Sequence, residues 1–182
     1  MNFERPSRFV GYEQLSCEGE VIALFKDGVK CEEITDEGSV IFDTTCFYAE
    51  SGGQIGDCGI IRGAACEAEV NEVHKAPHGQ PLHHIVMKKG TLHIGDRLSL
   101  CVDVRKRTQT MANHSCTHLL QSALKQIVGD HIAQAGSYNC PEYLRFDFTH
   151  FEKISEEQLM AVEALVNRYI TAGCPVIKEE LP

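Results

Sequence analysis

Two histidines stand four residues apart, at positions 114 and 118, in the segment RTQTMANHSCTHLLQSALKQIVG. On an α-helix this spacing places His114 and His118 on one face, where two imidazoles can bind the same metal ion. Zinc is the first candidate, because imidazole nitrogens suit it. Two solvent-exposed histidines that bind nothing are the alternative interpretation.

The residues between the two histidines exclude one class of zinc enzyme and one further metal ligand. Zinc proteases of the H-E-x-x-H type need a glutamate directly after the first histidine as general base, and Ser115 stands there instead. Cys116 lies about 200° around the helix from His114 and does not readily join the same site. A tetrahedral zinc site therefore needs further ligands from elsewhere in the protein.

A second pair with the same spacing, His74 and His78, lies in the segment HKAPH. Pro77 stands between them in a turn-rich stretch and disfavours a helix through both histidines. We therefore expect no metal site from this pair.

The element that carries His114 and His118 is predicted to be a helix from about Lys106 to Val128. Its apolar residues recur at helical spacing, and Gly129 can end it. The centre of this apolar stripe lies roughly 150° from the mean direction of the two histidines. The histidines should therefore face away from the helix's own core, toward another layer or a cleft. The stripe consists of Leu119, Leu120, Ala123, Leu124, Ile127 and Val128.

The residues up to about Val104 are typical of β-strands. Asp27-Gly28 between two apolar runs predicts a hairpin. Further strands are expected in SVIFDTT, CGIIRG, CEAEVNEVH, LHHIVMK and RLSLCVDV, with turns in KAPHGQP and KKGTLHIGD. Six or more short strands at this spacing indicate a small antiparallel barrel or sandwich.

After the first helix, YLRFDFTH alternates between apolar and polar residues and predicts a half-buried strand over 143–150. A second helix is expected in ISEEQLMAVEALVNRYITAG. Ser155 and Gln158 resemble a capping box at its start, and Gly173 can end it. CPVIKEELP (174–182) is predicted to begin another strand. The fold class is therefore α+β.

Composition limits the class of protein. The chain has 182 residues, 43% of them hydrophobic, and neither a signal peptide nor an apolar run that could span a membrane is evident. Its nine cysteines are odd in number and form no CxxC pair, which favours free thiols and argues against a zinc ribbon. We expect a soluble, cytoplasmic protein.

The net charge of −9 argues against broad nucleic-acid binding, and no DNA or membrane partner is expected. Arg105, Lys106 and Arg107 form a local exception. They could contact phosphates, or they could be the solvated first turn of a helix.

Four segments together resemble one family. They are FYAESGGQIGDCG (47–59), HSCTHLLQSAL (114–124), QAGSYNCPEYLRFDFTH (134–150) and VNRYI (166–170). In this order they resemble the editing region of alanyl-tRNA synthetase and its free-standing AlaX relatives. FVGYEQL (9–15) also resembles the segment before the barrel of the synthetase, which favours the full enzyme over a free-standing editor.

This resemblance implies a linker over residues 1–16 and a translation-factor-like antiparallel β-barrel over 17–105. Residues 106–182 would be the first part of an α+β editing domain, of the kind shared with threonyl-tRNA synthetase. The family's zinc site combines His-x3-His, here His114 and His118, with a later Cys-x3-His. Cys174 has no histidine four residues on, so the second pair is expected beyond Pro182 and the sequence is interpreted as an excised piece.

The resemblance further implies a fragment of alanine–tRNA ligase. ATP and Mg²⁺ would serve only an aminoacylation domain that is absent from this sequence. The editing reaction hydrolyses tRNA(Ala) mischarged with serine or glycine, because a pocket for alanine cannot strongly reject side chains that differ by a few atoms. Zinc would either activate water or orient the substrate.

Further residues are candidates for this reaction. Gln134 matches a position in the editing pocket, where its amide could bind a serine hydroxyl or a water; a polar residue at a helix–strand junction is the alternative. Gly52, Gly53 and Gln54 could contact the terminal adenosine of tRNA, or the two glycines could serve only a tight turn. Arg105, Lys106 and Arg107 could contact tRNA phosphates.

Three other functions stay open. The chain could be a free-standing AlaX-type deacylase, a tRNA-docking module without catalysis, or a generic metal-binding α+β protein. If it is the excised piece described above, it should deacylate Ser-tRNA(Ala) poorly and bind zinc weakly on its own.

Overall fold

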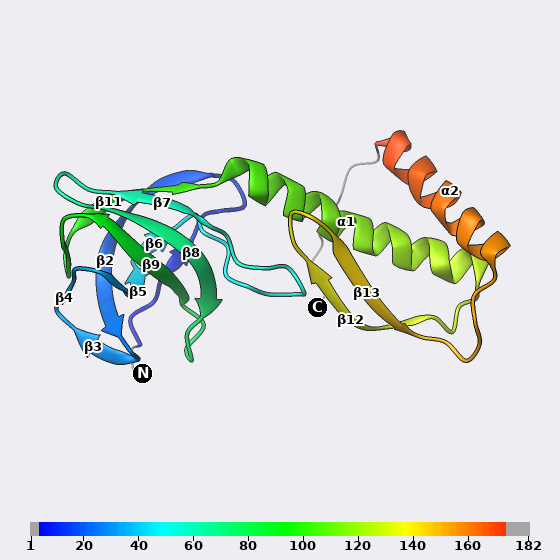
Figure 1. Cartoon of the computed structure of the whole chain (residues 1–182), viewed down its shortest axis with the longest axis horizontal. Helices are drawn as coiled ribbons and strands as arrows, with labels where there is room; N and C mark the ends of the chain where they lie inside the picture. Colours follow the sequence, from blue (N-terminus) through cyan, green and yellow to red (C-terminus); the bar gives the residue numbers. More distant parts are fainter. Residues whose placement is uncertain (1–3, 174–182) are drawn as a thin grey trace.

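The computed structural model describes residues 4–173 and shows a strand-rich lobe joined by a long helix to a smaller helix-and-hairpin lobe (Figure 1). The strand predicted over 174–182, and with it Cys174, lies outside the described residues. The elements are β1 (Arg8–Phe9), β2 (Ser16–Lys26), β3 (Val29–Cys31), β4 (Glu33–Ile34), β5 (Glu37–Phe42), β6 (Thr44–Thr45), β7 (Gly59–Arg62), β8 (Glu67–Lys75), β9 (Pro81–Lys89), β10 (Leu92–His93), β11 (Arg97–Val102), α1 (Val104–Ile127), β12 (Ala133–Asn139), β13 (Leu144–Thr149) and α2 (Glu156–Ala172).

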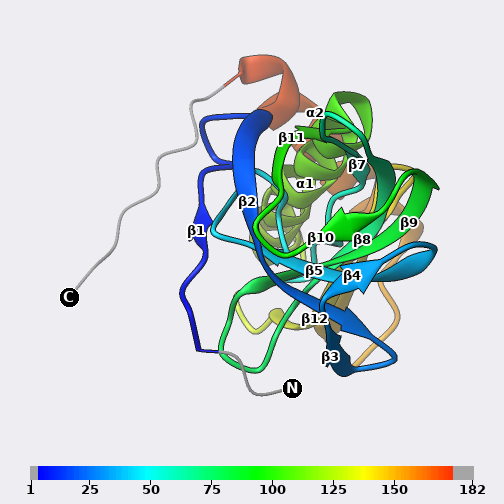
Figure 2. The same ribbon diagram turned by 90° about the vertical axis from the view of Figure 1, so that its left-hand side faces the viewer.

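The strand-rich lobe is a closed antiparallel barrel. Its strands follow the order β11-β7-β8-β9-β5-β2, and β11 also pairs with β2, which closes the sheet. Figure 2 shows this barrel facing the viewer, with α1 behind it. Phe42, Phe47 and Leu24 are among the largest side chains of the barrel core. The fold is thus α+β with a barrel, as predicted.

The predicted Asp27-Gly28 hairpin is confirmed. β3 pairs with the end of β2 in the register Lys26↔Val29, and both turn residues have positive φ, 51° at Asp27 and 77° at Gly28. Positive φ at both central positions is the requirement of the tight turn that Asp-Gly favours.

Two of the two-residue strands, β1 and β10, lie outside the segments that were predicted to be strands. β1 lies parallel to β6, and β10, inside the expected turn KKGTLHIGD, pairs with β4. Two-residue strands are too short to show an alternating pattern, so the sequence carries no signal for them. His74 lies in β8 and His78 in the turn after it, so the two share no helix, as expected.

The helix α1 begins two residues earlier than predicted, because Asp103 caps it. The Asp103 side chain accepts a hydrogen bond from the backbone N–H of Lys106 at 3.0 Å. Ala123 and Leu124 on the predicted apolar face are buried against Val162 and Leu165 of α2. The apolar stripe was therefore assigned correctly.

The helix α2 has the predicted capping box, formed by Ser155 and Gln158, and ends at Gly173, which has a φ of 61°. The alternating strand was also predicted correctly as β13, with Phe146 and Phe148 packed against the α1–α2 core. Its hairpin partner β12 was missed, because AQAGSYN lacks an alternating pattern.

A buried ion pair fastens the start of α1 to the barrel. The Arg107 guanidinium contacts both carboxylate oxygens of Asp57, with Nε 2.7 and 2.9 Å from them, and also donates to the carbonyls of Gly11 and Cys46. Arg107 is only 5% exposed. The expectation that Arg107 contacts tRNA phosphates does not fit this burial, whereas Arg105 and Lys106 are exposed.

All eight cysteines of the described residues are free thiols. Within residues 4–173, neither helix is long and apolar enough to cross a membrane.

Candidate functional site

His114 and His118 lie one turn apart on the face of α1 that is directed away from the α1–α2 core. Their rings are stacked, with centroids 5.3 Å apart and planes inclined by 25°. Both side chains line a cleft of about 530 Å³ between α1 and the barrel. The prediction that these histidines face a cleft is therefore confirmed.

Gln54 makes the closest polar contact to this pair. Its Oε1 lies 2.8 Å from Nδ1 of His114 and accepts a hydrogen bond from it. An amide oxygen can only accept, so Nδ1 carries the proton and Nε2 of the neutral ring keeps its lone pair. Burial, and secondarily the neighbouring His118, lower the pKa of His114. The neutral ring thus presents Nε2 as a ligand or a proton acceptor.

The position of Gln54 is fixed by the two glycines before it. Gly52 and Gly53 have φ values of 61° and 78°, and the backbones of Ser51 and Gln54 hydrogen-bond across them in both directions at 3.1 Å. This explains the glycines as a tight turn, one of the two interpretations offered above. A contact of Gly52 or Gly53 with the terminal adenosine stays a prediction.

The same turn is held against the hairpin of the smaller lobe. The Asn139 N–H donates to the Gly53 carbonyl at 2.7 Å, and the Ile55 N–H donates to the Asn139 carbonyl at 3.2 Å. A Cβ on Gly53 would lie 2.2 Å from Oγ of Ser137. Glycine at this position therefore permits barrel and hairpin to approach closely enough to place Gln54 beside His114.

Thr117 and Asn139 are buried polar residues that were not predicted as site residues, and they join α1 to the end of β12. The Thr117 hydroxyl, between the two histidines, donates to Oδ1 of Asn139 at 2.7 Å. Asn113 donates from its amide to the Cys140 carbonyl at 2.7 Å. Asn139 stands in one of the segments that carried the family resemblance, but no local pattern marks it as buried.

Gln134, the predicted catalytic residue, lies on β12 and is exposed; it does not line the cleft. Its amide donates to Oγ of Ser137 at 3.2 Å, so it reaches the Gly53 turn only through Ser137. It is the second residue of β12, the strand that follows α1, and stands at an irregularity in the β12–β13 register. Arg145, from the neighbouring strand, pairs with Asp147 at 3.1 Å.

The described residues fit half of a zinc site. His114 and His118 are suitable ligands, and the hydrogen bond from Nδ1 of His114 to an oxygen is the outer contact that metal-binding histidines commonly have. Zinc in proteins has at least three protein ligands. Over residues 4–173 no group of three or more His, Cys, Asp or Glu side chains could hold a metal ion.

Comparison with known proteins agrees with the family resemblance. The family model for class II (A) tRNA synthetases matches residues 1–106. The alanine–tRNA ligase of Geobacillus thermodenitrificans is 49% identical over 172 residues, which cover 93% of this chain and 20% of that protein. The alanine–tRNA ligase of Listeria monocytogenes serotype 4b is 45% identical over 183 residues, which cover 100% of this chain and 21% of that protein. The chain thus spans about a fifth of the length of these relatives.

Proposed function

We propose a hydrolytic editing function for this chain, which belongs to the class II (A) tRNA synthetase family. As part of an alanine–tRNA ligase, it would hydrolyse the ester of tRNA(Ala) mischarged with serine or glycine. Attachment of alanine with ATP and Mg²⁺ would take place in a separate aminoacylation domain. The setting would be the cytoplasm, with tRNA(Ala) as the partner.

In this proposed function, residues 1–16 would be a linker, 17–105 a translation-factor-like barrel and 106–182 the first part of the editing domain. The substrate would enter the cleft between the last two, where Gln54 of the barrel lies beside His114 of α1.

The observation that supports this function most strongly is the hydrogen bond between Gln54 and His114. It joins two of the segments that resemble the editing region, and it leaves Nε2 of His114 available at the cleft. A neutral imidazole in this state can hold a metal ion or accept a proton.

His114 and His118 would hold Zn²⁺, together with a Cys-x3-His pair outside the described residues. Zinc, when bound, supplies a Lewis acid that polarises an ester carbonyl or a water molecule. Gln54 orients the His114 ring, and the Gly52-Gly53 turn holds Gln54 in place. The exposed side chains of Arg105 and Lys106 would meet phosphates of the acceptor end.

Gln134 is the least supported member of this set, because it does not line the cleft. The proposed role of Gln134 is a hydrogen bond to the serine hydroxyl or to a water molecule, and this bond would form only when the substrate is bound.

The test is deacylation of Ser-tRNA(Ala) by this chain and by a longer chain that extends through the expected Cys-x3-His segment. We expect slow hydrolysis by this chain, faster hydrolysis by the longer one, and loss of activity in its His114→Ala variant. A longer chain that binds Ser-tRNA(Ala) but does not hydrolyse it would contradict the editing function and favour tRNA docking, the second candidate. The exposed Arg105 and Lys106 support that candidate.

A further inference from the structure

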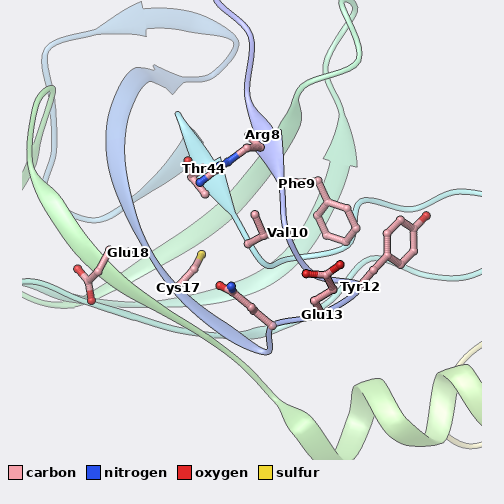
Figure 3. A pocket seen from close by; sticks show the side chains of 9 residues that line it. Arg8, Phe9, Val10, Tyr12, Glu13, Cys17, Glu18 and Thr44 are labelled. Carbon is pink, nitrogen blue, oxygen red and sulfur yellow. The ribbon is translucent and has the colours of Figure 1, made fainter.

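One wall of the cleft has no assigned function. Residues 11–15, in the segment between β1 and β2, line the cleft opposite the histidine face of α1. Tyr12 is the aromatic residue of this wall, and it is 75% exposed. Its ring stands edge-on to that of Phe9, at the end of β1, with centroids 5.1 Å apart, and Figure 3 shows the two rings beside each other.

The backbone under Tyr12 is held firmly, although its ring is exposed. The Gly11 carbonyl accepts a hydrogen bond from the buried Arg107 at 2.8 Å, and the N–H groups of Glu13 and Gln14 both donate to the Val10 carbonyl. A Cβ on Gly11 would lie 2.2 Å from the Cys46 carbonyl oxygen, so the segment lies directly on the barrel. An aromatic ring on a fixed backbone loses little freedom when a flat ligand stacks on it.

The cleft combines two kinds of surface. His114 and His118 offer imidazole nitrogens. Elsewhere Tyr12 and the half-exposed Met111 offer apolar and aromatic surface, with the polar side chain of Gln14 beside them. A volume of about 530 Å³ suffices for a small-molecule ligand.

The substrate class that needs both kinds of surface is an aminoacyl ester of adenosine. The ester is attached to the ribose of the terminal nucleotide, so the adenine is only one sugar away from the carbonyl that reacts. We propose that the wall formed by residues 11–15 binds this adenosine and that Tyr12 stacks on the adenine, while the ester lies at His114 and His118. This inference rests on the editing function proposed above and adds a positioning residue to it.

The ligand for the test is 3′-deoxy-3′-(L-serylamino)adenosine, an amide analogue that is not readily hydrolysed. We expect Tyr12→Ala to weaken its binding to this chain about 10-fold, which corresponds to about 1.4 kcal/mol at 25 °C. Stacking on exposed aromatic rings has effects of this size. Tyr12→Phe should stay within about 2-fold, since stacking needs the ring and not the hydroxyl. Tyr143→Ala is the matched control, because Tyr143 is also exposed, at 57%, but does not line the cleft.

A spectroscopic readout tests stacking directly. The chain contains no tryptophan, so Tyr12→Trp introduces a single reporter. We expect the analogue to quench its emission saturably, a cytidine version to quench it less, and Tyr143→Trp to show no quenching. Circular dichroism of each variant checks that the fold is intact.

Three results of the binding experiments would overturn the inference: wild-type affinity in a folded Tyr12→Ala variant, unquenched Tyr12→Trp emission at saturation, or no binding of the analogue to the wild-type chain. Failure of the editing function looks different. If the analogue binds in a Tyr12-dependent way but the longer chain does not hydrolyse Ser-tRNA(Ala), the adenosine site is supported and the editing function is rejected. If the longer chain hydrolyses Ser-tRNA(Ala) and its Tyr12→Ala variant has an unchanged kcat/KM, the editing function is supported and the adenosine site is rejected.

Discussion

The side-chain oxygen of Gln54 lies 2.8 Å from Nδ1 of His114, although 60 positions separate the two residues in the chain. The bond connects the barrel to the helix of the smaller lobe and selects the tautomer of His114 that leaves Nε2 open. The candidate site is thus assembled at the contact between the two lobes.

Replacing Gln54 should therefore change the tautomer of His114. In Gln54→Leu the acceptor is lost, and we expect the ring to shift toward the form protonated at Nε2. Nitrogen NMR shifts of the imidazole measure this directly. Gln109→Leu, an exposed position on the same helix, is the control. An unchanged tautomer in Gln54→Leu would mean that the hydrogen bond does not orient the ring.

The glycines of two tight turns give a matched pair for stability. Gly53→Ala places a Cβ 2.2 Å from Ser137, whereas Gly28→Ala has a similar φ, 77° against 78°, with nothing within 4 Å. Gly28→Ala should cost about 1–2 kcal/mol of unfolding free energy from backbone strain alone. Gly53→Ala should cost clearly more and also displace Gln54. Urea denaturation compares the two, and equal losses would contradict the close contact.

The buried Asp57–Arg107 pair should be important for stability. Removing one partner leaves the other charge buried, and we expect Arg107→Ala to lower the free energy of unfolding by about 3–5 kcal/mol. Arg105→Ala, at an exposed position two residues away, should change it by less than about 0.5 kcal/mol. Chemical denaturation measures both. A small loss in Arg107→Ala would show that water reaches the pair.

Arg105 and Lys106 are expected to act in tRNA binding and not in folding. Each charge removed should weaken tRNA binding and reduce the slope of log K against log salt by about 1. Titrations of tRNA(Ala) at several salt concentrations check this, with Lys88→Ala as the control, because Lys88 already pairs with Glu69 on the barrel. An unchanged slope in Arg105→Ala and Lys106→Ala would remove both residues from the interface.

Buried His83 should make the fold sensitive to acid. Burial lowers the pKa of His83 to about 4, and its ring nitrogens contact the Thr45 hydroxyl and the Val40 carbonyl. The unfolded chain, with an ordinary histidine pKa near 6.5, then binds the proton more readily than the folded one. Stability should therefore fall as the pH drops from about 6.5 to about 4, by about 3 kcal/mol from this residue.

The measurement for His83 is the slope of unfolding free energy against pH over this window. It should be shallower in His83→Gln than in the wild-type chain, and unchanged in His78→Gln, which replaces an exposed histidine. Equal slopes in all three proteins would mean that His83 is not the group that takes up the proton.

Local periodicity was sufficient to predict much of the fold. The apolar stripe of α1 placed His114 and His118 on the cleft side, and alternation in β13 identified the strand that packs Phe146 and Phe148. These signals depend on neighbours within a few residues, which a sequence displays directly. β12 lacks such a pattern and was missed.

The remaining features depend on contacts between distant segments. The basic run at 105–107 looks uniform, but Asp57 and the carbonyls of Gly11 and Cys46 hold Arg107 in the interior. The contact of Gln54 with His114 and the position of Tyr12 in the same cleft likewise appear only after the barrel has closed. No spacing rule within one segment could have predicted them.

Zinc content tests the central claim most directly. Elemental analysis would compare this chain with a longer chain that includes the expected Cys-x3-His segment, and with the His114→Ala and His118→Ala variants of that longer chain. We predict about one zinc per longer chain, much less in this chain, and loss of the metal in both variants. A longer chain that retains its zinc without these two histidines would contradict the account.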